Sequence, residues 1–203
     1  MTTIKTKFRR FAAPFQYSMI ALVLMNAAPW RAVAQDGHQH APAAQQSKSR
    51  DKQASAGVLL KMVQDSTERF KNVSVAQAEG YALQFGCVSG SDSGAMGLHY
   101  VNGALVSSGV LDATRPQIVI YEPMPNGDKK LIGADFLVIA DTWNAKYASP
   151  PQLMGQLFHL FPSPNRFGLP AFYTLHVWAW KDNPKGAFVN WHPHVSCASF
   201  PGQ

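Results

Sequence analysis

The sequence predicts an α+β domain in which one or two N-terminal helices pack on a mainly antiparallel sheet. Apolar residues repeat at helical spacing only near the start of the folded region, and runs rich in β-branched and aromatic residues follow. An Asn126-Gly127 pair, the strongest short signal of a β-hairpin, separates two of these runs. Helical runs followed by strands that short turns connect are typical of the α+β class.

Two helices are expected before the strands begin. The first covers residues 56–71, because apolar residues recur there at helical spacing: Leu59, Met62, Val63 and Phe70. The second is a short helix over residues 75–79, where Ser74 and Gln77 form a capping box and Gly80 provides a stop.

The strands are expected in the rest of the folded region, and glycine-rich or proline-containing turns separate them. Residues 153–161 fit a short helix or a strand equally well. The expected extended runs, in chain order, are 81–88, 97–101, 118–122, 130–140, 171–180 and 187–191.

Residues 1–34 have the pattern of a cleaved export signal. A basic segment at 5–10 precedes an apolar stretch at 17–25, and the small residues at 32–34 indicate cleavage before Gln35. The apolar stretch is too short for a membrane span, which needs about 20 residues. We therefore expect a secreted or periplasmic protein with no stable membrane span after cleavage.

The remaining chain divides into a linker and one domain. Residues 35–54 contain no large apolar side chain and no periodicity, so a disordered linker is expected there. Residues 55–203 then form a single domain with ample apolar content, since 46% of the whole chain is hydrophobic.

The charge distribution argues against a nucleic-acid partner. The formal net charge of the chain is +6, but five of its 18 basic residues lie in segment 1–34, which has no acidic residue. The other 13 basic residues face 12 acidic ones, so the rest of the chain is nearly neutral. A nearly neutral domain has no electrostatic attraction for a polyanion.

The two cysteines, Cys87 and Cys197, are expected to form a disulfide. An exported protein enters an oxidising compartment, where two lone cysteines usually pair. Such a bond would attach the C-terminal segment to an early strand of the domain.

Histidines provide the main functional lead. Strand alternation over 171–180 places His176 among aromatic side chains with Thr174 as its only polar neighbour, so its ring needs a partner. Glu122, at the end of an apolar strand, could supply a carboxylate. His192 and His194 point the same way if they are extended. The sequence therefore predicts a copper or zinc site built from some of the following residues: His99, Glu122, His159, His176, His192 and His194.

Each candidate ligand also has a structural interpretation. His99 and His159 are compatible with hydrogen-bonded core or interface positions, and His192 and His194 with a surface position beside a proline. Glu122 could be a solvated charge at the end of a strand.

Two other functions stay open. An aromatic set could line a pocket for a small ligand or partner: Phe167, Phe172, Tyr173, Trp178, Trp180 and Trp191. A hydrolytic or redox enzyme with a catalytic histidine is the other alternative. No nucleophile or general base stands out by motif, so the sequence leaves open whether the protein is an enzyme.

Several segments resemble a family of uncharacterised exported bacterial proteins. The resemblance rests on four segments and covers roughly residues 60–200: 85–90, 94–100, 165–170 and 175–186. The family has no assigned activity, so the resemblance implies export and a single domain, and no catalytic role.

Overall fold

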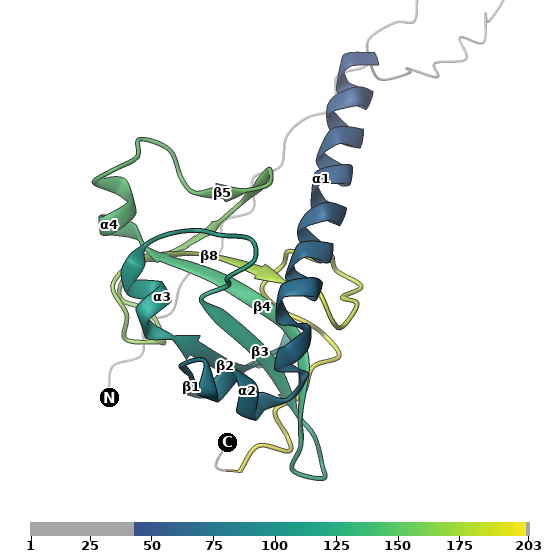
Figure 1. Cartoon of the computed structure of the whole chain (residues 1–203), viewed down its shortest axis with the longest axis vertical. Coiled ribbons are helices and arrows are strands. Elements are labelled where there is room, and N and C mark those ends of the chain that lie inside the picture. Colours follow the sequence, from purple (N-terminus) through teal and green to yellow (C-terminus); the bar gives the residue numbers. More distant parts are fainter. Residues whose placement is uncertain (1–42, 202–203) are drawn as a thin grey trace, which may run out of the picture. The chain divides into compact units, whose positions relative to one another are not determined.

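The computed structural model describes residues 43–201, and it confirms the α+β class (Figure 1). One long helix, α1 (Ala43–Thr67), continues through a short 3-10 turn (Glu68–Lys71) into α2 (Val73–Ala78). The remaining elements, in chain order, are β1 (Tyr81–Gly90), β2 (Gly94–Asn102), α3 (Gly103–Ser108), β3 (Ile118–Pro123), β4 (Lys129–Ile139), α4 (Ala140–Asn144), β5 (Gln152–Leu153), β6 (Gln156–Leu157), β7 (His159–Phe161) and β8 (Phe172–Val177).

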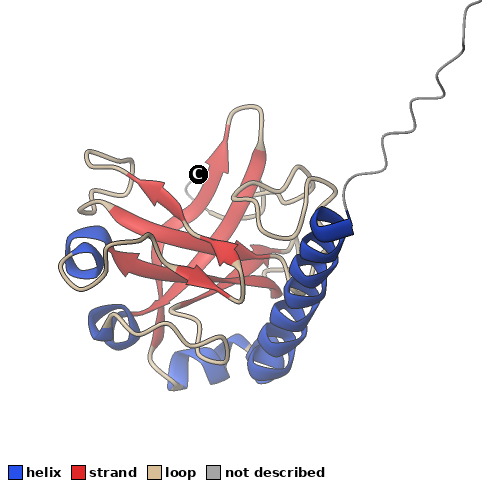
Figure 2. Cartoon of the chain, turned by 90° about the horizontal axis from the view of Figure 1, so that it is seen from above, coloured by secondary structure: helices blue, strands red, loops and turns tan. Residues whose placement is uncertain are grey.

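Six strands form one curled sheet in the order β1-β2-β3-β4-β8-β7 (Figure 2). Every neighbouring pair in it is antiparallel, and the expected hairpin at Gly127 joins β3 to β4. The strands β5 and β6 pair separately, so the ambiguous stretch at 153–161 is extended.

Helix α1 covers one face of the sheet, and the candidate site lies on the other face. Helix α1 lies along one face (Figures 1 and 2), where Leu59 and Val63 are fully buried in a cluster with Phe136 of β4 and Leu175 of β8. Side chains alternate along a strand, so Asp135 and His176, which neighbour these residues in sequence, point to the opposite face. That opposite face carries the candidate site.

Helix α1 begins earlier than the sequence predicts. It starts at Ala43, so residues 43–54 are helical, whereas a disordered linker was expected there. Their described side chains, from residue 45 on, are exposed, and the first buried apolar residue of the helix is Ala56. The absence of large apolar residues from this segment agrees with its exposure. The export signal and residues 35–42 lie outside the described residues.

The end of the sheet also differs from the prediction. Strand β8 stops at Val177, because the chain bends and the Trp178 N–H donates to the carbonyl of Ala187. Residues 187–191, expected as a strand, form turns and irregular structure. The bend also anchors α1, since Gln64 Nε2 donates to the Ala179 carbonyl at 2.6 Å. Long-range contacts of this kind leave no local signal.

The predicted disulfide between Cys87 and Cys197 is present, with a Cα–Cα distance of 5.7 Å. It attaches the C-terminal segment to β1. That segment is also held by Glu122, whose Oε1 accepts from the Ser196 N–H and whose Oε2 pairs with Lys181 Nζ at 2.6 Å. Within residues 43–201, no helix is long and apolar enough to cross a membrane.

Candidate metal centre

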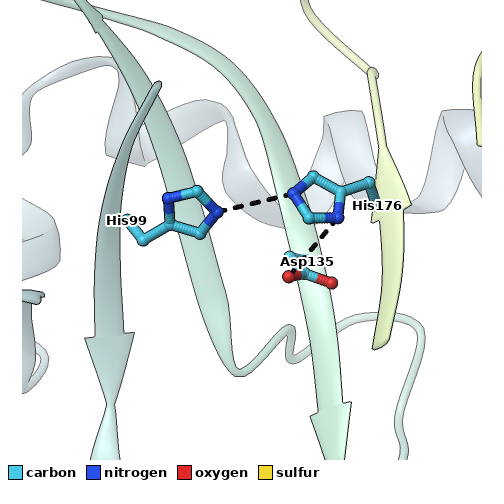
Figure 3. Close-up of side chains that lie close together, drawn as sticks. All are labelled: His99, Asp135 and His176. Atoms are coloured by element: carbon cyan, nitrogen blue, oxygen red, sulfur yellow. Dashed lines mark hydrogen bonds and ion pairs between the residues drawn. The ribbon is translucent and has the colours of Figure 1, made fainter. Parts of the chain in front are cut away.

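Three side chains from three strands meet on the face of the sheet that α1 leaves free. His99 comes from β2, Asp135 from β4 and His176 from β8, and their side chains point toward one another (Figure 3). Asp135 and His176 are direct partners in the β4–β8 ladder, so they share a face. His99 pairs with Ile120 of β3, and Ile118, two residues earlier on the same face of β3, pairs with Asp135. The side chain of His99 therefore lies on the same face of the sheet as Asp135 and extends toward it across β3.

The three groups are almost completely buried, with 5%, 3% and 2% exposure for His99, Asp135 and His176. One ligand atom from each residue lies within 4.8 Å of the other two. The Nε2 atoms of the two histidines are 3.4 Å apart, and Nδ1 of His176 is 3.6 Å from Oδ2 of Asp135. The cluster therefore has the residue types and the spacing to hold a metal ion.

Neighbouring groups hold the ring of His99 and the carboxylate in place. Nδ1 of His99 lies 3.1 Å from the Gly97 carbonyl, which can only accept a hydrogen bond. The hydroxyl of Thr174 donates to Oδ1 of Asp135 at 2.5 Å. Oδ2 is the carboxylate oxygen that faces the histidines.

The tautomer of His176 decides how the two rings interact. A neutral His99 that donates from Nδ1 to Gly97 has an unprotonated Nε2. If His176 likewise keeps its proton on Nδ1 beside Asp135, its Nε2 is also unprotonated, and two lone pairs meet across 3.4 Å. Nδ1 of His176 is buried and has no partner within hydrogen-bond distance. With the proton on Nδ1, a cation bound between the two Nε2 atoms would remove the repulsion of the lone pairs. With the proton on Nε2, His176 donates to Nε2 of His99 and its Nδ1 lone pair is left without a partner.

Burial also sets the protonation of the cluster. Burial, with a smaller contribution from His176, lowers the pKa of His99 from 6.5 to about 4. Burial, with a contribution from His159, lowers the pKa of His176 from 6.5 to about 3. Burial raises the pKa of Asp135 from 3.8 to about 6, against the opposing hydrogen bond from Thr174. At pH 7 both imidazoles are therefore neutral and the carboxylate is mostly ionised, which are the forms that bind metals.

The cluster lies beside a small apolar pocket of about 30 Å³, roughly the space of one water molecule. Its polar lining consists of the three cluster residues and Thr174. The rest of the lining is aliphatic or aromatic: Phe85, Met96, Ile118, Leu137, Phe161, Phe167, Leu169 and Phe172. An ion held at the cluster would thus have an apolar space beside it.

Of the six predicted ligands, the structure brings together His99 and His176. Glu122 is committed to Lys181 and the Ser196 N–H, away from the cluster. His159 is exposed on the edge strand β7, opposite Thr174 in the ladder. These two residues lie outside the described three-residue cluster.

His192 and His194 also lie outside the cluster. His192 is fully buried and has both ring nitrogens occupied, since Nε2 lies 3.0 Å from the Asp182 carbonyl and Nδ1 accepts from the His194 N–H. His194 is exposed. The chain therefore uses His192 to fix the C-terminal segment.

The sequence analysis missed Asp135. Its signal is visible in retrospect, because Asp135 is the one charged residue within the apolar run 131–140. A charge in the middle of a buried strand needs a partner, and that partner is a functional clue.

The predicted aromatic set is divided by the fold. Phe167 and Phe172 line the pocket at the cluster. Trp178 instead packs edge-on against His192, with ring centroids 4.9 Å apart, and its indole N–H donates to the Val189 carbonyl. Trp180 donates to the hydroxyl of Thr67 at the end of α1. These two tryptophans hold structural elements together.

Comparisons of this chain with protein-family models, with curated proteins and with solved structures found no match. The function must therefore be argued from the cluster itself.

Proposed function

We propose that the protein binds a divalent transition-metal ion through His99, Asp135 and His176. The observation that carries the proposal is the convergence of these three buried side chains, whose ligand atoms lie within 4.8 Å of one another. A buried, mostly ionised carboxylate faces two neutral imidazoles, and among residues 43–201 no Lys or Arg forms an ion pair with it. Buried charges in proteins are usually paired or bind metals. A divalent ion would supply the missing positive charge.

The spacing of the imidazoles favours zinc over copper(II). Two nitrogens bound to zinc at about 2.0–2.1 Å with a tetrahedral angle lie about 3.3–3.4 Å apart. The same bond length with the right angle of a tetragonal copper site gives about 2.9 Å. The Nε2 atoms of His99 and His176 are 3.4 Å apart, which matches the tetrahedral value. With Asp135 as the third ligand, zinc would keep a fourth position for water or another small ligand.

Binding is favoured here over acid–base catalysis. A histidine that relays a proton to a carboxylate needs a hydrogen bond between them and a reacting group beside the ring. The 3.6 Å separation of His176 Nδ1 and Asp135 Oδ2 is longer than a hydrogen bond. The pocket lining contains one hydroxyl, that of Thr174, and it is donated to Asp135.

The Cys87–Cys197 disulfide supports a location outside the reducing cytoplasm. On the basis of this disulfide and of the export signal predicted from the sequence, we propose that the protein is secreted or periplasmic. In such an oxidising compartment, thiolate ligands would be oxidised to disulfides, whereas imidazole and carboxylate ligands would remain able to bind zinc or copper.

The test is a metal titration of the full chain by calorimetry, with elemental analysis of the product. The chain should bind one zinc ion tightly, and His99→Phe and His176→Phe, which keep a planar aromatic ring but remove the ligand nitrogens, should abolish binding. His194→Phe makes the same change at an exposed histidine outside the cluster and should leave binding unchanged. No zinc or copper binding by the native chain, or equal binding by both ring variants, would refute the proposal.

A further inference from the structure

A larger groove adjoins the pocket beside the His/Asp cluster. The groove has a volume of about 300 Å³, at the lower end of the range for small-molecule sites. The pocket and the groove share four lining residues: Phe85, Ile118, Leu137 and Leu169. These four side chains stand between the two spaces, so a ligand with one end at the cluster would reach the groove by passing them.

The shared wall contains an unusual residue. Phe85 has a φ of 64°, and its side chain is 44% exposed although it is a large apolar ring. It lies in a bulge of β1 between Gln84 and Cys87, and its ring packs edge-on against Phe167 with centroids 5.4 Å apart. A non-glycine residue in the left-handed region is unfavourable and is concentrated at functional sites. The bulge places an exposed aromatic ring where a ligand would pass.

The chemistry of the lining specifies the ligand. The groove is apolar apart from Gln84 and Ser107, and no charged residue lines it. A metal ion binds imidazoles in their neutral form and a carboxylate in its ionised form, so a divalent ion held by His99, Asp135 and His176 would leave a net charge of +1 at the cluster. One negative charge balances that site, whereas the second charge of a phosphate would find no Lys or Arg among the residues that line the pocket and the groove.

We infer that the groove binds the apolar chain of a small monocarboxylate, whose carboxylate completes the coordination of the metal ion. This inference rests on the proposed metal binding. The carboxylate takes the fourth position of the ion, and the chain passes between Phe85 and Leu169 into the groove.

The experiment measures the binding of octanoate to the zinc-loaded chain by calorimetry. Octanol has the same tail without the charge, and acetate has the same head without the tail. Octanoate should bind at least tenfold more tightly than either compound, and this preference over octanol should disappear when zinc is removed.

Two matched substitutions locate the tail. Leu169→Trp adds bulk in the shared wall and should weaken octanoate binding at least tenfold without changing zinc affinity. Leu157→Trp makes the same change at a residue that is 64% exposed and lines neither space, so it should have no effect. Ser107→Trp at the exposed rim of the groove is a second blocking variant, in case Leu169→Trp does not fold.

The outcomes separate this inference from the proposed function. Normal zinc affinity with octanoate no tighter than octanol, or with no effect of either blocking variant, overturns the inference and leaves the metal site intact. Equal octanoate binding by the zinc-free chain overturns the coordination of the carboxylate. Absence of zinc binding overturns the proposed function, and this inference with it.

Discussion

Nε2 of His99 lies 3.4 Å from Nε2 of His176, although the two residues are 77 positions apart in the chain. Two strands, β3 and β4, lie between their own strands in the sheet. In a flat sheet the backbones of β2 and β8 would be about 14 Å apart, so the meeting depends on two side chains that both extend over the inner face of a curled sheet. The contact is thus a property of the whole sheet and depends on the registers of β2, β3, β4 and β8.

The substitution Asp135→Asn should change stability in opposite directions with and without metal. Without metal, the amide removes a buried charge and can still accept the hydrogen bond of Thr174, so the free energy of unfolding should rise or stay equal. With zinc present, loss of this direct carboxylate ligand should weaken metal binding by at least about 10–100-fold, because even the outer-shell partners of metal ligands typically contribute that much. Urea denaturation with EDTA and with excess zinc measures both effects. A variant that excess zinc stabilises as much as it stabilises the native chain would contradict the metal role of Asp135.

The metal-free chain should lose stability as the pH falls from 6.5 to 4. The histidines of the unfolded chain take up protons below 6.5, whereas His99 and His176 in the folded chain resist protonation down to about 4 and 3. Their stabilisation is therefore present above pH 6.5 and is lost on acidification.

Asp135 acts in the opposite direction, because its carboxyl takes up a proton near pH 6 when folded and near 3.8 when unfolded. Two histidines outweigh one carboxyl, so the net loss should be on the order of several kcal/mol. Urea denaturation in EDTA across this pH range is the measurement, and His176→Phe should flatten the profile. A stability that rises on acidification would show that the histidines are not buried in their neutral forms.

Breaking the Cys87–Cys197 disulfide should destabilise the domain strongly. The bond joins residues separated by 110 positions, and loop entropy alone assigns a cross-link of this span on the order of 4–5 kcal/mol. The free energy of unfolding of the Cys87→Ser/Cys197→Ser double variant should fall by about this amount relative to the native chain. The Glu122 contacts should still hold the C-terminal segment in the folded variant, so zinc binding should be preserved. A double variant as stable as the native chain would exclude a structural role for the bond.

Helix α1 should contribute to the stability of the domain only through the buried residues of its second half, which pack on the sheet. Leu59 is fully buried against the sheet, and Leu59→Ala should cost about 2–5 kcal/mol through lost packing and a cavity. Its neighbour Val58 is 49% exposed, and Val58→Ala should change stability by less than about 0.5 kcal/mol. Thermal or urea unfolding distinguishes the two substitutions. Equal effects would mean that α1 does not dock on Phe136 and Leu175 as described.

Much of the fold could be predicted because its signals are local. The apolar spacing around Leu59 and Val63 predicts a helix, and the structure confirms one there. The Asn126-Gly127 turn predicts the β3–β4 hairpin, and the β-branched run at 118–122 predicts β3. Short helices such as α3 were missed, although Asn102 caps it by accepting from the Leu105 N–H, because Asn is common in turns as well as at caps.

The site was only partly predictable, since a histidine shows its chemistry in sequence but not its neighbours. His176 was expected to need a partner, either a carboxylate, a carbonyl or a metal, and Glu122 was the carboxylate that could supply it. The structure supplies Asp135 instead, because the β4–β8 register sets these two residues side by side, whereas Glu122 pairs with Lys130 at the far end of β3. His192 and His194 looked suited to chelation, but the backbone around His192 occupies both of its ring nitrogens.

By itself the sequence determined which residues could carry chemistry, where the chain alternates between helix and strand, and which cysteines could pair, since these depend on residue type and on neighbours along the chain. Only the tertiary structure decided that His99, Asp135 and His176 converge in a buried site, and that a groove with Phe85 in its lining adjoins it. Convergence depends on strand order, on register and on the curl of the sheet, and each of these results from packing that involves the whole domain.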